Sequence, residues 1–148
     1  KIVFLTNAWV WNNPFYGSLI RNAEYLPVRE GLDEIMPHLR SLIERGYSIA
    51  VYPEGTRSKD CCIGRFHQGA FYMAREFGLE ILPMILYGPG KILPKTGWHL
   101  HKGKFFVEVD KPLTQEDLSA MGDLKQQAST MRKRYKEKYE EIANRMEQ

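Results

Sequence analysis

The sequence predicts an α/β protein with a largely parallel β-sheet flanked by helices. Short apolar segments of strand length alternate along the chain with segments whose apolar residues recur every three or four positions, which is typical of strand–helix–strand units. Gly46 and Gly78 follow two of the helical segments, and glycine commonly ends helices. The polar stretch 53–58 comes directly after an apolar segment, and the carboxyl ends of parallel strands are where ligand loops lie.

The first third of the chain predicts two strands and two helices. Residues 1–6 are mostly apolar and predict a strand. Residues 7–22 have helical spacing, and Pro14 is expected to kink or divide that helix. Residues 25–28 predict a short strand, and residues 33–45 predict a helix because their apolar positions recur at helical spacing.

The middle of the chain continues the alternation. Residues 48–52 are rich in β-branched and aromatic side chains and predict a strand, and residues 68–77 predict a helix. Residues 80–87 and 104–109 predict two further strands. Between these strands, the proline- and glycine-rich residues 88–97 predict a loop.

The C-terminal part predicts two helices. Thr114 is expected to cap a short helix that runs through Leu118. From Leu124 onward the apolar positions predict an amphipathic helix of about six turns. These positions are Ala128, Met131, Tyr135, Tyr139, Ile142 and Met146.

Three alternatives stay open for this apolar stripe: packing on the domain, binding a membrane surface, and forming a coiled coil with a partner. We expect residues 1–123 to form the main domain and residues 124–148 to form a basic helix of that same domain.

Composition excludes several classes of protein. The chain has 148 residues, 43% hydrophobic and 26% charged, which is typical of one globular domain. No apolar run approaches the roughly 18 residues of a membrane span. The excess of positive charge lies after residue 123, where seven Lys/Arg face four Glu. Because residues 1–123 are neutral overall and the chain lacks a recognisable nucleic-acid-binding motif, no nucleic-acid partner is expected.

Cys61 and Cys62 are adjacent, which suggests a reducing compartment. Too few ligands of suitable spacing surround them for a metal site.

Residues 53–58 carry the chemistry that the sequence makes most visible. Gly55 allows a tight turn or a close approach to a ligand. Arg57 offers donors suited to phosphate or carboxylate, and Thr56 and Ser58 add hydroxyl groups. Two alternatives follow from chemistry alone: a ligand site, or a turn in which Glu54 and Arg57 pair with each other.

The same stretch resembles a known family. Tyr52 to Ser58 reads Tyr-Pro-Glu-Gly-Thr-Arg-Ser, which resembles the Phe-Pro-Glu-Gly-Thr-Arg-Ser motif of the glycerophospholipid acyltransferases, the 1-acylglycerol-3-phosphate O-acyltransferase family. Four other segments are similar to blocks of that family in the same order: 11–17, 24–29, 65–71 and 81–85. The resemblance covers residue 1 to about residue 110.

The resemblance implies a reaction and a site. A fatty acyl group would move from acyl-CoA or acyl-carrier protein, with no permanently bound cofactor, to the hydroxyl of a lysophosphatidate-like acceptor in phospholipid synthesis. By resemblance, the acceptor would be bound by Arg29, Glu54, Gly55, Thr56 and Arg57. Glu54 would either accept a hydrogen bond from the glycerol or hold an arginine. The protein is expected in the cytoplasm, at a membrane surface or within a larger membrane-associated chain.

The family's general base is absent. In the family a His-x-x-x-x-Asp motif takes the hydroxyl proton, but no histidine here has Asp five positions later. The four histidines are His38, His67, His99 and His101. We therefore expect an acyltransferase fold cut short at its N-terminus, with no catalytic residue in this chain and little or no turnover by it. His67, near the motif, is the best substitute. The alternative is a non-catalytic relative that only binds lipid phosphate.

Overall fold

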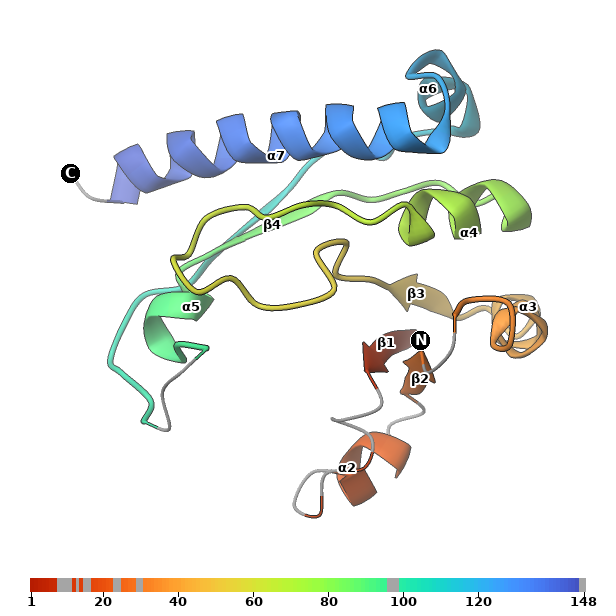
Figure 1. Cartoon of the computed structure of the whole chain (residues 1–148), viewed down its shortest axis with the longest axis horizontal. Helices are drawn as coiled ribbons and strands as arrows, with labels where there is room; N and C mark the ends of the chain where they lie inside the picture. The colour runs from red at the N-terminus through yellow and green to blue at the C-terminus, as the bar shows by residue number, and fades with distance from the viewer. Residues whose placement is uncertain are drawn as a thin grey trace. The chain divides into compact units, whose positions relative to one another are not determined.

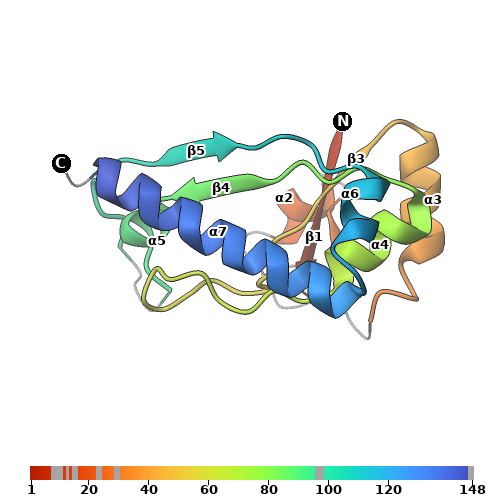
Figure 2. The ribbon, with the colours of Figure 1, turned by 90° about the horizontal axis from the view of Figure 1, so that it is seen from above.

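The chain consists of two compact units, Lys1–Tyr52 and Pro53–Gln148. The computed structural model describes residues 1–7, 12, 14, 17–22, 25–28, 31–95 and 99–146. Figures 1 and 2 together label the helices and strands of both units. Each unit has buried apolar side chains of its own, and each is described by itself below.

The first unit is built on a three-stranded parallel sheet. Its strands are β1 (Ile2–Asn7), β2 (Leu26–Val28) and β3 (Ser48–Ala50), in the order β2-β1-β3. In this register Leu5 lies opposite Leu26 and Val3 lies opposite Ile49. Two helices connect the strands, α2 (Gly17–Asn22) and α3 (Met36–Glu44). The parallel pairing confirms the predicted class of fold.

Some predicted boundaries in this unit shift. The helix expected at 33–45 begins at Met36, with Pro37 in its first turn, because proline lacks the N–H that a helix interior uses and suits this position. The strand expected at 48–52 pairs with β1 only as far as Ala50. Of the helix expected at 7–22, the structure describes α2, and residues 8–11, 13, 15 and 16 lie outside the described residues.

The second unit contains an antiparallel pair of strands and four helices. β4 (Met84–Tyr87) pairs with β5 (Phe106–Val109), so that Met84 lies opposite Val109. The helices are α4 (Gly69–Phe77), α5 (Pro89–Ile92), α6 (Gln115–Ala120) and α7 (Leu124–Met146). As predicted, Gly78 ends α4, and Thr114 caps α6 by accepting a hydrogen bond from the Asp117 N–H.

Three expectations in the second unit were wrong in detail. The strand expected at 104–109 begins at Phe106. The strand expected at 80–87 is shorter, because Ile81 forms only an isolated bridge with Leu113 and Pro83 has no N–H to donate. The loop expected at 88–97 contains α5, which begins at Pro89, a residue whose fixed φ favours the first helical position.

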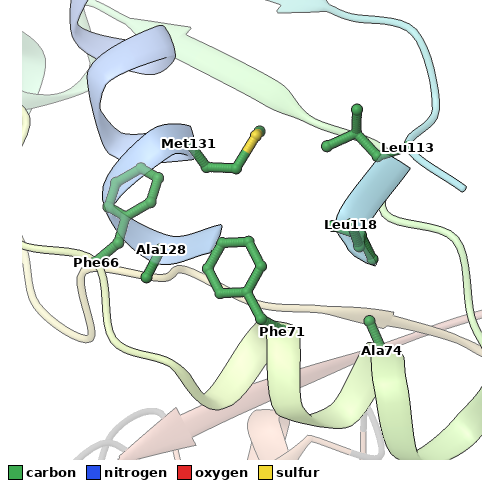
Figure 3. Close-up of a cluster of buried hydrophobic side chains, with 7 residues drawn as sticks. All are labelled: Phe66, Phe71, Ala74, Leu113, Leu118, Ala128 and Met131. Carbon is green, nitrogen blue, oxygen red and sulfur yellow. The ribbon is translucent and has the colours of Figure 1, made fainter. Parts of the chain in front are cut away.

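The long C-terminal helix α7 packs inside the second unit. It runs along β4 and also contacts α4 (Figures 1 and 2). One core cluster comprises Phe66, Phe71, Ala74, Leu113, Leu118, Ala128 and Met131, and Figure 3 shows these side chains converging between α4, α6 and α7. A second cluster buries Ile142 of α7 against β4. Of the three alternatives for the apolar stripe, packing on the domain is confirmed. Among the described residues, no helix has the length and apolar character to cross a bilayer.

Charge also fixes α7 on β5. Asp110 forms ion pairs with Arg134 at 2.6 Å and with Lys138 at 3.2 Å. Glu108 pairs with Arg145 at 2.6 Å and with Lys138 at 3.5 Å. Glu108 of β5 and Asp110, which follows that strand, therefore form ion pairs with three of the seven basic residues that follow residue 123.

These contacts lower the pKa values of both carboxyl groups. The hydrogen bond from Arg145 is the main cause of the lowered pKa of Glu108. Burial pushes the pKa of Asp110 upward, but the hydrogen bonds from the Lys111 N–H and from Lys138 outweigh it, so that this pKa is also lowered. A carboxylate with a lowered folded-state pKa stabilises the fold above its unfolded value of about 4. That stabilisation is lost as the pH falls through the folded value.

Acid is therefore expected to weaken the second unit partly through Asp110. We expect the urea midpoint of the protein to fall as the pH decreases from about 5 to about 3, and to fall less steeply in Asp110→Asn, which is already weaker at pH 7. Glu140→Gln, an exposed charge change on α7, is the control and should follow the wild type. Parallel pH curves for Asp110→Asn and the wild type would contradict the assignment.

Candidate functional site

The motif loop, residues 53–58, turns at Gly55. Gly55 has φ +65°, in the left-handed region that favours glycine. The ring of His67 lies beside it, with Cδ2 3.4 Å from where a Cβ on residue 55 would stand. The backbone N–H of His67 also donates to the Pro53 carbonyl at 2.8 Å. His67, the substitute that the sequence suggested, thus contacts the loop.

Glu54 makes a contact that the sequence did not predict. Its Oε2 accepts a hydrogen bond from the Gly64 N–H at 2.7 Å. The Gly64 carbonyl in turn accepts from Arg132 Nε at 2.8 Å. The motif is thereby connected through residue 64 to α7. Neither role considered for Glu54, a glycerol contact or an arginine contact, includes this backbone amide.

Gly64 should be sensitive to the smallest substitution. A Cβ there would stand 2.8 Å from Glu54 Oε2, so Gly64→Ala should displace the carboxylate and lose its hydrogen bond. We expect a loss of about 1–3 kcal/mol in the free energy of unfolding, measured by urea denaturation. In a Glu54→Ala background the same change should cost less than half as much, because the obstacle is gone. Equal costs in both backgrounds would show that the carboxylate is not what alanine meets.

Arg57 and Thr56 contact a segment far along the chain. Arg57 Nη1 donates to the Leu93 carbonyl at 3.4 Å. Lys95 Nζ donates to Thr56 Oγ1 at 2.9 Å. In the described part of the chain Glu54 and Arg57 form no ion pair, so the alternative of a turn closed by that pair is not what the structure shows.

Sequence reasoning missed Lys95. It lies in the stretch 88–97, which the sequence predicts as a proline- and glycine-rich loop, and it follows Thr56 by 39 residues. One signal could have found it: this stretch follows β4 directly, and loops after strands are where α/β proteins bind ligands.

The predicted site residues are only partly brought together. Glu54, Gly55, Thr56 and Arg57 share one loop of the second unit. Arg29 lies outside the described residues. Its convergence with Arg57 on one phosphate therefore stays a prediction.

The fold and this loop define an α/β protein with an exposed arginine on a loop that hydrogen bonds join to distant segments of the chain. A family model described as Acyltransferase matches residues 1–87, more than half of the chain, and the chain belongs to this family. The resemblance drawn from residues 52–58 is thus confirmed.

Individual relatives agree. The chain is 43% identical over 74 residues to the chloroplastic 1-acyl-sn-glycerol-3-phosphate acyltransferase LPAT1 of Arabidopsis thaliana, covering 49% of this chain and 20% of that protein. It is 25% identical over 137 residues to the 1-acyl-sn-glycerol-3-phosphate acyltransferase of Helicobacter pylori, covering 87% and 56%. The chain therefore spans from a fifth to about half of the length of these relatives.

A solved structure supports the fold. The crystal structure of the 1-acyl-sn-glycerophosphate acyltransferase PlsC from Thermotoga maritima matches with a TM-score of 0.67 and 24% identity. The match covers 92% of this chain and 56% of that one. It confirms the α/β architecture.

Proposed function

We propose that the protein transfers a fatty acyl group from acyl-CoA or acyl-carrier protein to the free hydroxyl of a lysophosphatidate-like acceptor, in phospholipid synthesis. Membership of the Acyltransferase family and the names of the relatives support the reaction class. The observation that carries the proposal for the site is the exposed Arg57 on a loop whose one carboxylate, Glu54, is engaged by a backbone N–H.

The chemistry of the loop suits a phosphate. A phosphate monoester carries about two negative charges near neutral pH, and the planar guanidinium of Arg57 can donate two parallel hydrogen bonds to it. Glu54 Oε2 accepts from the Gly64 N–H, and within the described residues Glu54 forms no direct ion pair with Arg57. Arg29 is proposed as a second cation. Together they would orient the acceptor, and orientation of a bound reactant contributes several kcal/mol to catalysis in principle.

The general base is proposed to lie outside residues 1–148. An alcohol needs a base beside it to attack a thioester at neutral pH, and no histidine of this chain has the family's aspartate. Residues 1–148 alone should therefore bind the acceptor but turn over slowly.

Because the acceptor is a lipid, we also propose that the protein works at a cytoplasmic membrane surface. The buried stripe of α7 would not be the part that contacts the bilayer.

An acylation assay tests the proposal. The full-length protein and a chain of residues 1–148 would be given lysophosphatidate with acyl-CoA or acyl-carrier protein thioester, and phosphatidate would be measured. We expect turnover by the full-length protein and a rate at least about 100-fold lower for residues 1–148. An ordinary rate from residues 1–148 would refute the missing base. Binding of lysophosphatidate without turnover by the full-length protein would favour the alternative, a non-catalytic lipid-phosphate binder.

A further inference from the structure

Two long-range hydrogen bonds cross between the motif loop and the segment after α5. Arg57 reaches outward to the Leu93 carbonyl, and Lys95 reaches back to the Thr56 hydroxyl. The two bonds join residues 56 and 57 on one side to residues 93 and 95 on the other, so the Arg57 and Lys95 side chains both extend between the same two short segments. All three polar side chains, on Thr56, Arg57 and Lys95, are exposed.

This contact places two cationic side chains, Arg57 and Lys95, between the same two segments. In the ranges that the structure describes, neither Arg57 nor Lys95 forms an ion pair with a carboxylate. By contrast, Arg134, Lys138 and Arg145 of the same unit all lie against Glu108 or Asp110. The Arg57 and Lys95 side chains carry like charges, which repel each other. An anion bound beside them would remove that cost, so the arrangement favours a dianionic ligand over a neutral one.

We propose that Lys95 is a further phosphate-binding residue of the acceptor site, an inference that rests on the function proposed above. An ammonium group has three donors, and Thr56 Oγ1 takes one of them. The remaining donors can bind phosphate oxygens beside the Arg57 guanidinium. Arg57 and Lys95 would then both donate to a phosphate monoester that carries roughly two negative charges, with Arg29 as the third proposed cation. The hydrogen bond to Thr56 keeps the flexible lysine side chain near the loop before the acceptor arrives.

This proposal assigns specificity to the segment after α5. Lys95 should contribute to binding of acceptors that carry a phosphate and should contribute nothing for acceptors that lack it. A lysine that only fastened two loops together would affect both kinds of acceptor alike. The comparison of lysophosphatidate with a monoacylglycerol therefore separates the two roles.

The experiment uses the full-length protein with four variants: Lys95→Gln, Lys95→Arg, Arg57→Ala and Lys102→Gln. Lys102 is an exposed lysine between α5 and β5 and serves as the matched control. For Lys95→Gln we expect a KM for lysophosphatidate about tenfold higher, the usual effect of losing one charged hydrogen bond, with kcat and the KM for the acyl donor little changed. Lys95→Arg should recover most of the affinity, and Lys102→Gln should behave as the wild type.

The outcomes separate failure of this inference from failure of the proposed function. A normal KM in Arg57→Ala would overturn the phosphate site itself, and Lys95 with it. A raised KM in Arg57→Ala with a normal one in Lys95→Gln would overturn only the role of Lys95. An equal loss of lysophosphatidate and monoacylglycerol use in Lys95→Gln would also overturn it. Should turnover be too slow to measure, calorimetric binding of glycerol 3-phosphate replaces it, with about a tenfold loss of affinity expected.

Discussion

Replacing Phe71 with alanine is expected to lower the free energy of unfolding by about 3–5 kcal/mol. Phe71 is only 3% exposed and lies in the cluster that joins α4 to α7. Figure 3 shows its ring directed from α4 toward Ala128 and Met131. Truncation would remove this ring from between two helices that cannot fully collapse into the space. Urea denaturation followed by circular dichroism measures the loss.

Phe105 provides a matched control for this prediction. It is also a phenylalanine of the second unit, but it is 57% exposed. Phe105→Ala should therefore change the free energy of unfolding by no more than about 0.5 kcal/mol. If both variants lost the same stability, or if Phe71→Ala unfolded like the wild type, the cluster between α4 and α7 would not be the core of this unit.

Helices α4 and α7 could be predicted because their signals are local, whereas the short α5 was not predicted. The segment 68–77 has its apolar residues on one face and a glycine directly after it, and the observed α4 ends at Gly78 as expected. The stripe beginning at Leu124 gave α7 its position and nearly its full length. Periodicity and end residues act within a few positions, so a single sequence contains them.

Strand pairing and the alternatives for α7 could not be decided in the same way. The antiparallel pairing of β4 with β5 depends on which strand lies beside β4 and in which direction that strand runs. Nothing within residues 84–87 indicates either. The stripe of α7 has one pattern for a core, a membrane surface and a coiled coil. Only the contacts with Phe66, Phe71 and Ile85 distinguish these alternatives.

The candidate site shows the same division. The local motif identified the loop, its glycine and its arginine. The partner of Glu54 lies ten residues away at Gly64, and the partner of Thr56 lies at Lys95. The motif also could not reveal that the Glu54 carboxylate accepts from the Gly64 backbone amide, because every residue except proline has such an N–H and the sequence does not mark which one is the partner. The motif therefore indicates which groups could bind a ligand, but contacts with residues far along the chain determine which of those groups are already occupied.

Arg57→Ala in the full-length protein is expected to lower kcat/KM for lysophosphatidate by about 10- to 100-fold, mainly through KM. The loss corresponds to one or two charged hydrogen bonds to the acceptor phosphate. Arg57 has no carboxylate partner in an ion pair within the described residues, so its removal leaves no buried anion behind. Steady-state kinetics with lysophosphatidate varied at saturating acyl donor measures the effect, and the KM for the donor should stay within about twofold.

Two further variants determine whether this loss belongs to the phosphate contact. Arg57→Lys keeps the charge but loses the paired donors of the guanidinium, so its kcat/KM should fall between those of the wild type and Arg57→Ala. Arg75→Ala removes an exposed arginine of α4 whose ion pair with Glu76 is at the surface and should have little effect. An unchanged KM for lysophosphatidate in Arg57→Ala would place the phosphate elsewhere. A loss shared equally by Arg75→Ala would reduce the effect to one of net charge, because a site built at residues 53–58 depends on which arginine is removed.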